Sequence, residues 1–268
     1  MIKKTLSIII LLVTNCYLKA QDTTITYFDS KWNETEVNSQ VYYRKLYRNK
    51  DKLWVVEDYY SDSKECQMKG QYLNRGLKKE HGEFIYYFEN GVIDHKGLYE
   101  KGKKYGEWIY YFKNGNTDYS GAYIKGKRHG EWNWYFKNGK IASREIYKYG
   151  ELIKIEQWDT SGVKIQNPIK LVDASFVGGE ANMNQFIIDN LVYPDEASQK
   201  GQHGIVYIQF VVEKDGSLAN IEISKGAYPM LNEAALEVVQ KMPNWIPGRH
   251  HNRCIRMIYT LPINFRLG

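Results

Sequence analysis

A segment of eleven residues occurs three times in this chain at a constant interval. The copies begin at His81, Tyr105 and His129, which are 24 residues apart, and they read HGEFIYYFENG, YGEWIYYFKNG and HGEWNWYFKNG. A weaker copy begins at Tyr149. A fixed period of this length indicates stacked supersecondary units, because one unit cannot bury an apolar face by itself. The period therefore restricts the middle of the chain to a repeat architecture.

Each repeat unit combines an aromatic stretch with two turn signals. The aromatic stretch favours a β-strand, and the Asn-Gly that follows allows positive φ at both central positions of a tight turn. A second strand, for example Asp118 to Ile124, leads to the turn Lys125-Gly-Lys127 and the next unit. The sequence predicts a train of β-hairpins in one sheet over residues 76–162, and these units resemble MORN-type repeats of the bacterial variant.

Positive charge is concentrated in the repeats. Residues 75–150 contain 15 Lys or Arg and 9 Asp or Glu, whereas residues 171–268 contain 8 and 10. One interpretation is solvated turn tips that keep sheet edges from pairing with neighbouring chains. The alternative is a contact with an anionic envelope surface such as a lipid, lipopolysaccharide or glycan. The basic turn residues are Lys101, Lys103, Lys104, Lys125, Lys127 and Arg128.

The first twenty residues have the pattern of a signal peptide. A basic start at Lys3 and Lys4 precedes an apolar stretch, and Leu18-Lys-Ala20 gives a small-residue cleavage site before Gln21. The apolar stretch is shorter than the ~20 residues that span a bilayer. The alternatives are a lipid anchor at Cys16 and a retained N-terminal anchor. We therefore expect an exported protein, periplasmic or associated with the outer membrane, with no nucleic acid as a partner.

The last hundred residues have the pattern of an α+β region with an antiparallel sheet. Apolar residues occupy alternate positions from Val206 to Val212, and Asp215-Gly216 then predicts a hairpin to a second strand. Helices are predicted from about residue 182 to 190 and from 231 to 242, and a short helical turn from Asp195 to Gln199. One further strand is predicted from Arg253 to Leu267.

The order of these elements resembles the C-terminal domain of the TonB energy transducers over roughly residues 171–268. The similarity lies in Tyr193-Pro194, the strand from Gly204, Asp215-Gly216, the second helix, Trp245-Ile-Pro-Gly248 and the final strand. The family resemblance implies that a segment of an outer-membrane transporter adds as a strand beside the final strand. The residues that it implies for this site are Tyr193, Pro194, Ile255, Met257, Ile258, Tyr259, Leu261, Ile263 and Phe265.

Pro262 supports an edge position for the final strand, because proline has no backbone N–H to donate to a neighbouring strand. There are two alternatives to a partner strand at this edge. The edge pairs with a second copy of the chain, or the repeats cover it. A membrane-anchored energy transducer is a further alternative, although the proline-rich spacer of true transducers is absent.

The sequence predicts the following division of the chain. A signal peptide occupies 1–20, an irregular β region with degenerate repeats as one interpretation occupies 21–75, MORN-like hairpins occupy 76–162, a linker occupies 163–171, and the TonB-like region occupies 172–268. We expect a non-enzymatic protein without cofactor or metal, because no catalytic motif or metal spacing is present. His250 and His251 are interpreted as solvated loop residues, and Cys66 and Cys254 as unpaired thiols.

Overall fold

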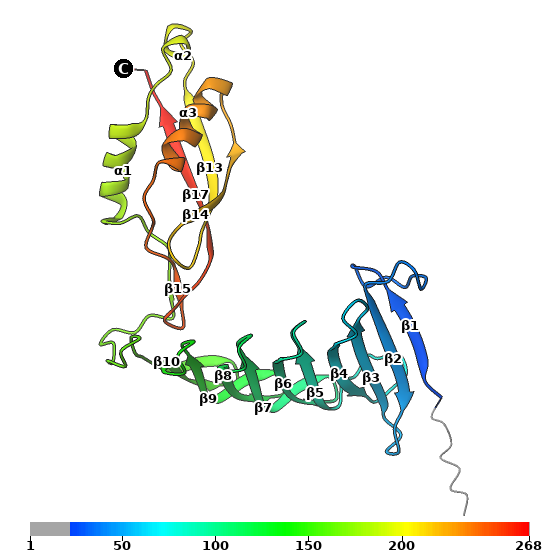
Figure 1. Cartoon of the computed structure of the whole chain (residues 1–268). Coiled ribbons are helices and arrows are strands. Elements are labelled where there is room, and N and C mark those ends of the chain that lie inside the picture. Colours follow the sequence, from blue (N-terminus) through cyan, green and yellow to red (C-terminus); the bar gives the residue numbers. More distant parts are fainter. Residues whose placement is uncertain (1–21, 268) are drawn as a thin grey trace, which may run out of the picture. The chain divides into compact units, whose positions relative to one another are not determined.

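The computed structural model of the protein describes residues 22–267 (Figure 1). Eleven antiparallel strands, β1 to β11, follow one another in sequence order in one sheet, and helices and two three-stranded sheets make up the C-terminal region. The predicted fold class is therefore confirmed. The predicted signal peptide and Cys16 lie outside the described residues. Two compact units are distinguished, one up to Gly91 with Tyr99–Gly102, the other Val92–Leu98 with the chain from Lys103 onwards.

Up to residue 75, where the sequence predicts an irregular β region, the first unit contains regular strands. Each strand pairs with the next, and the register of β2 with β3 is continuous from Tyr42↔Tyr60 to Arg48↔Trp54. Burial of Val56 and Phe84 gives this unit its own small core. The strands are β1 (Thr24–Phe28), β2 (Tyr42–Arg48), β3 (Trp54–Tyr60), β4 (Cys66–Tyr72) and β5 (Gly82–Tyr87); β6 (Ile93–Glu100) has residues in both units.

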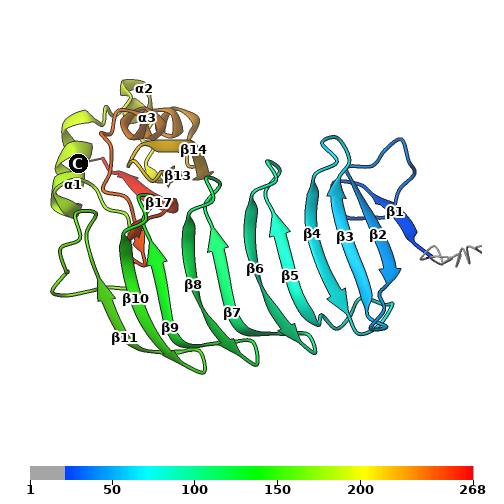
Figure 2. The same ribbon diagram turned by 60° about the horizontal axis from the view of Figure 1, so that its bottom comes forward.

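In the second unit the repeats are held together by tryptophan packed on glycine. Trp132 is fully buried, and its ring lies so close to Gly121 that a Cβ there would stand 2.3 Å from Cδ2. Trp108 has the same relation to Gly97. The indole Nε1 of each tryptophan donates to a backbone carbonyl at 3.0 Å. The strands, side by side in Figure 2, are β7 (Lys103–Tyr111), β8 (Thr117–Ile124), β9 (Lys127–Tyr135), β10 (Ile141–Lys148) and β11 (Glu151–Gln157).

The tight turn with two positive φ values does not lie at Asn-Gly, where the sequence predicts it, but at the other turn of the repeat. At the Asn-Gly turn only Gly115 has positive φ, and Phe112 N–H bonds to the carbonyl of Asn116 across a wider loop. The tight turn with two positive φ values is Lys125-Gly126, at 52° and 82°. The prediction for the Asn-Gly turn was wrong because the Asn114 side chain accepts from the N–H of Asn116 and so stabilises the wider loop.

Two of the basic residues assigned to turn tips lie against aromatic rings instead. Lys104 Nζ is 4.0 Å from the Trp108 ring centroid and donates to the Tyr110 hydroxyl at 2.7 Å. Arg128 lies over Trp132, 4.7 Å from its centroid. Burial, followed by the charge of Arg128, lowers the pKa of Lys104. The interpretation as solvated turn tips is therefore wrong for Lys104 and Arg128, whose side chains pack against aromatic rings.

The C-terminal region is built on the sheet β14-β13-β17 with α3 packed on β13 and β14 (Figure 1). Alternate residues of β13 from Val206 to Val212 are buried, as their period predicts. The hairpin at Asp215-Gly216 forms. Gly216 accommodates Trp245, whose backbone N–H donates to the Gly216 carbonyl. The elements are α1 (Gly179–Asn190), α2 (Asp195–Gln199), β13 (Gly204–Val212), β14 (Leu218–Lys225), α3 (Pro229–Gln240) and β17 (Met257–Phe265).

The strand predicted from Arg253 to Leu267 is divided in the structure. Its first residues form β16 (Arg253–Cys254), which belongs to a separate small sheet with β15 (Arg249–His250) and β12 (Leu171–Val172). The turn at His251 and Asn252, both with positive φ, folds β16 back onto β15, and the bond from Ile255 N–H to the Gly248 carbonyl continues this pairing, so that pairing with β13 begins only at Met257. In the segment predicted as a linker, the side-chain amide of Gln157 bonds to both backbone groups of Ile169. No helix among residues 22–267 is long and apolar enough to cross a membrane.

Candidate functional site: the edge strand of the C-terminal sheet

The strand β17 is paired on one side only within the described part of the chain. Its neighbour is β13, and all nine residues pair without interruption from Met257↔Val212 to Phe265↔Gly204. A regular strand with one unpaired side presents its backbone N–H and carbonyl groups as a template for another strand. This side of β17 is the candidate partner-binding edge.

Pro262 fixes which backbone groups point to the open side. Pro262 is opposite Tyr207, and without an N–H it belongs to a pair that exchanges no ladder bonds, whose backbone groups point away from β13. Since these pairs alternate with bonded pairs, Ile258, Thr260 and Asn264 also direct N–H and carbonyl groups outward. The open edge thus offers three N–H donors, with a gap at Pro262.

Most of the predicted site residues of β17 direct their side chains into the core. Leu261, Ile263 and Phe265 are buried, and Met257 and Tyr259 pack against the same core. The Tyr259 ring lies 4.7 Å from that of Trp245. Among the predicted β17 residues only Ile258 is largely exposed, at 68%. A partner strand would therefore meet the backbone of β17 and the exposed face formed by Ile258, Thr260, Pro262 and Asn264.

The predicted Tyr-Pro pair lies near the end of the same strand. The ring of Tyr193 meets Phe265 edge-on at 5.5 Å, and the Tyr193 hydroxyl donates to the carbonyl of Gln202. Pro194 is the N-cap residue of α2 and has extended backbone. The structure thus brings Tyr193 and Phe265 together, as the family resemblance implies, and gives Tyr193 a packing role there.

Ile255 does not share this edge. It lies between β16 and β17, and it lines a cavity with Cys254 and Arg253 rather than the open side of the strand. Thr260 and Asn264 lie within the predicted segment and on the exposed face of β17, but they are not among the individual residues predicted for the site. Polar side chains in an apolar strand pattern gave no reason to select them, although Pro262 together with a period of two would have indicated them.

The opposite edge of this sheet is a poorer template. Strand β14 pairs with β13 with two shifts of register, between Tyr207 and Ile208 and between Gln209 and Val211. Asn220 within it has a positive φ of 50°. Bulges twist and interrupt an edge, which protects it from pairing with other chains. The two edges therefore differ, and only β17 is regular along its length.

Immediately before β17, the turn of the hairpin at residues 249–254 is inserted against the repeats. His251 is buried, its ring is stacked on Trp134 at 3.8 Å, and Nδ1 bonds to the carboxylate of Glu145. Glu145 also accepts from Tyr147 Oη at 2.5 Å and Ser143 Oγ at 3.1 Å. The interpretation of His251 as a solvated loop residue was therefore wrong, because its partner lies far away in the sequence.

The charge of this buried pair is set by burial and hydrogen bonding together. Burial alone would raise the pKa of Glu145, but the bonds from His251 and Tyr147 outweigh it, and the pKa falls below its ordinary value. Burial lowers the pKa of His251 despite the bond to Glu145. Glu145 is therefore ionised and His251 neutral near neutral pH, so that Nδ1–H donates to the carboxylate.

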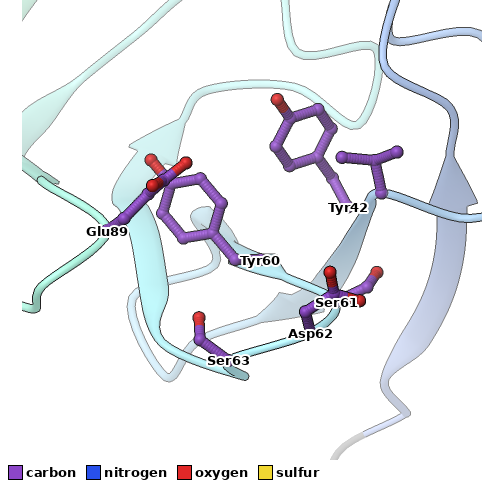
Figure 3. A pocket seen from close by; sticks show the side chains of 7 residues that line it. Tyr42, Tyr60, Ser61, Asp62, Ser63 and Glu89 are labelled. Carbon is purple, nitrogen blue, oxygen red and sulfur yellow. The ribbon is translucent and has the colours of Figure 1, made fainter.

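A cavity in the first unit is a further place where polar groups gather. Figure 3 shows the side chains that line it, which carry hydroxyl and carboxylate groups but no basic or thiol group. Within residues 22–267, no cluster of three or more His, Cys, Asp or Glu could hold a metal ion, and Cys66 and Cys254 are free thiols. The cavity is lined by Val41, Tyr42, Tyr60, Ser61, Asp62, Ser63 and Glu89.

The C-terminal region is similar to known proteins in sequence. Residues 189–267 match the family model described as Gram-negative bacterial TonB protein C-terminal. Among solved structures, the chain is similar to the NMR solution structure of Helicobacter pylori TonB-CTD, with 25% identity, a TM-score of 0.27, and coverage of 33% of this chain and 79% of that chain. No curated protein matches the chain. The predicted resemblance to the TonB C-terminal domain is thus confirmed over residues 189–267, whereas the MORN-type resemblance stays a prediction.

Proposed function

We propose that this chain is a non-enzymatic protein of the cell envelope that binds an extended segment of an outer-membrane protein by strand addition to β17. The observation that carries the proposal is the difference between the two sheet edges. One edge is bulged, and the other offers nine regular residues with an unpaired side. The match of residues 189–267 to the TonB C-terminal family supports the class of partner, because that family interacts with outer-membrane proteins.

In this proposal the backbone of β17 supplies affinity, and its exposed face supplies selectivity. The N–H groups of Ile258, Thr260 and Asn264 would each meet a carbonyl of the partner. Pro262 would leave one carbonyl of the partner without a donor, which fixes the register. The repeats would act as a scaffold that carries this sheet, through the contact of the 249–254 hairpin with β10.

The experiment uses two substitutions at one residue. Thr260→Pro removes an outward N–H without touching the bonds to β13, whereas Thr260→Val keeps this N–H and changes the side chain alone. The full chain is titrated by calorimetry with peptides from the N-terminal segments of outer-membrane transporters. We expect Thr260→Pro to weaken binding at least about tenfold and Thr260→Val to change it much less.

Equal affinity of Thr260→Pro and the unaltered chain would contradict strand addition at this edge. Near-ultraviolet circular dichroism of both variants shows whether the packing of Trp245 and Tyr259 is retained. Sedimentation of the chain without peptide tests the alternative occupant, a second copy of β17. A dimer that Thr260→Pro dissociates, together with no peptide binding, would replace the proposed partner with the chain itself.

The energy-transducer alternative depends on the N-terminal segment, which lies outside the described residues. Mass spectrometry of the mature protein isolated from cells decides it, because a chain beginning at Gln21 has lost both the N-terminal apolar segment and Cys16, the two anchors that the sequence offers.

A further inference from the structure

The second unit contains a cavity of about 330 Å³ where the 249–254 hairpin meets the repeats. Phe112 and Phe136, from the Asn-Gly ends of two repeat hairpins, line it together with Ile255 and Cys254. These groups make most of its surface apolar. Its volume lies within the range of about 300–1,000 Å³ that is usual for small-molecule sites.

The walls of this cavity are fixed by hydrogen bonds between the hairpin and the repeats. Arg253 Nη1 bonds to the carboxylate of Asp118 and donates to the carbonyl of Tyr135 at 3.2 Å. Asn252 Nδ2 donates to the carbonyl of Trp158 at 2.6 Å. Because both sides are anchored in this way, the cavity is formed before any ligand binds.

The charged groups around the cavity are mostly cationic and without counter-charges. Asp118 is engaged by Arg253. Lys137 and Lys214 have no carboxylate partner within residues 22–267, and Arg249 has only the amide oxygen of Asn252, at 3.3 Å. Cations gathered around one opening repel each other, and an anion placed among them would relieve this repulsion.

We propose that this cavity binds an amphiphilic anion, that is, a phosphate or carboxylate head group attached to an apolar chain. Lys137, Lys214 and Arg249 hold the head group, and the guanidinium of Arg249 can donate two hydrogen bonds to two oxygens of either a phosphate or a carboxylate. The apolar chain lies along the rings of Phe112 and Phe136, where its surface is removed from water. This site is distinct from the open edge of β17 and does not require the proposed partner.

The test measures binding of hexyl phosphate to the full chain by calorimetry, with inorganic phosphate and hexanol as partial probes. Hexyl phosphate should bind at least about tenfold more tightly than either probe, because each lacks one half of the recognition. The double variant Lys137→Ser, Lys214→Ser should lose at least about tenfold in affinity. The matched control Lys127→Ser, Lys148→Ser removes the same charge from exposed residues outside the cavity and should bind as the unaltered chain does.

A second arm distinguishes the source of the ligand. Retention on vesicles of phosphatidylglycerol but not of phosphatidylcholine, lost in Lys137→Ser, Lys214→Ser, would support the proposal with a membrane lipid as the ligand. Binding of hexyl phosphate without retention on vesicles would support it with a free amphiphile. The proposal is overturned if neither occurs, if the control variant loses binding equally, or if inorganic phosphate binds as tightly as hexyl phosphate.

Discussion

Glu145 stands in the repeat at the position that Gly121 holds 24 residues earlier, and both residues are direct cross-strand partners of Trp132. One repeat earlier, Gly121 in β8 leaves room for the ring of Trp132 in the next strand, β9. One period after Trp132 the sequence has Glu156 instead of an aromatic residue, so no indole covers Glu145. The ring of His251 arrives there from the C-terminal region and completes the carboxylate's hydrogen bonds. The end of the repeat series is thereby converted into an attachment point.

Loss of the His251 ring is expected to destabilise the second unit. His251→Ala removes the hydrogen bond to Glu145 and leaves a buried carboxylate with only hydroxyl donors, at a cost of about 3 kcal/mol in the free energy of unfolding. Urea unfolding followed by tryptophan fluorescence measures this change. His203 is an exposed histidine of the same unit, and His203→Ala should change stability by less than about 0.5 kcal/mol. Equal effects of the two substitutions would show that the buried pair contributes nothing.

Acidification should weaken the same attachment. The pKa of His251 is lowered from its ordinary 6.5 by burial first and then by the nearby charges of Arg128 and Lys170, against the opposing effect of Glu145. The unfolded chain therefore takes up a proton near pH 6.5 and the folded chain only at lower pH, so stability falls as the pH drops below about 6.5. The lowered pKa of Glu145 adds a further loss as the pH falls from 4.5 through its folded value.

The pH effect is measured by repeating urea unfolding at several values between about pH 7 and pH 5. The unaltered chain should lose more stability over this interval than His251→Gln, which cannot titrate at this position. His250, whose pKa is also lowered, first by burial and then by the charge of His251, titrates in both proteins, so the difference between the two curves reports the presence of an ionisable His251. Parallel curves for the two proteins would exclude His251 as the titrating group.

The packing of tryptophan on glycine predicts a large effect of one methyl group. Gly121→Ala would place Cβ 2.3 Å from Trp132 Cδ2, and displacement of the fully buried indole should cost about 3 kcal/mol. Gly76→Ala is the control, since the nearest atom to its Cβ would be 3.9 Å away, and it should be nearly neutral. Thermal unfolding monitored by circular dichroism compares the two; a neutral Gly121→Ala would mean that the strands separate easily at this point.

The tight turn at Lys125-Gly126 should be improved by asparagine. Lys125 has φ of 52°, which costs energy for most side chains but much less for asparagine, and Asn-Gly is the preferred pair in such turns. Lys125→Asn should therefore raise the free energy of unfolding by about 0.5 kcal/mol. Lys127→Asn, which makes the same replacement at the start of β9, should give no increase. A loss of stability in Lys125→Asn would contradict the turn geometry.

The local patterns of the chain specified most of its elements. The period of 24 residues gave the hairpins, the alternation from Val206 to Val212 gave β13, and Asp215-Gly216 gave its hairpin. Each of these signals acts between residues close in the sequence, where turn geometry and side-chain period decide the conformation. The Asn-Gly turn shows the limit of this reasoning, because Asn-Gly suits both a tight turn and a wider loop, and a hydrogen bond to the Asn114 side chain stabilises the wider loop.

The sequence alone determined the repeated hairpins of the middle region, the strand β13 with its hairpin, the helices of the C-terminal region, and, through Pro262, that β17 lies at an edge. Only the tertiary structure decided that β17 is the regular edge and β14 the bulged one, and that His251 is buried on Glu145. These features depend on register and on contacts between residues as far as 106 positions apart. No short-range pattern encodes such contacts, because they form only when separately specified elements pack together.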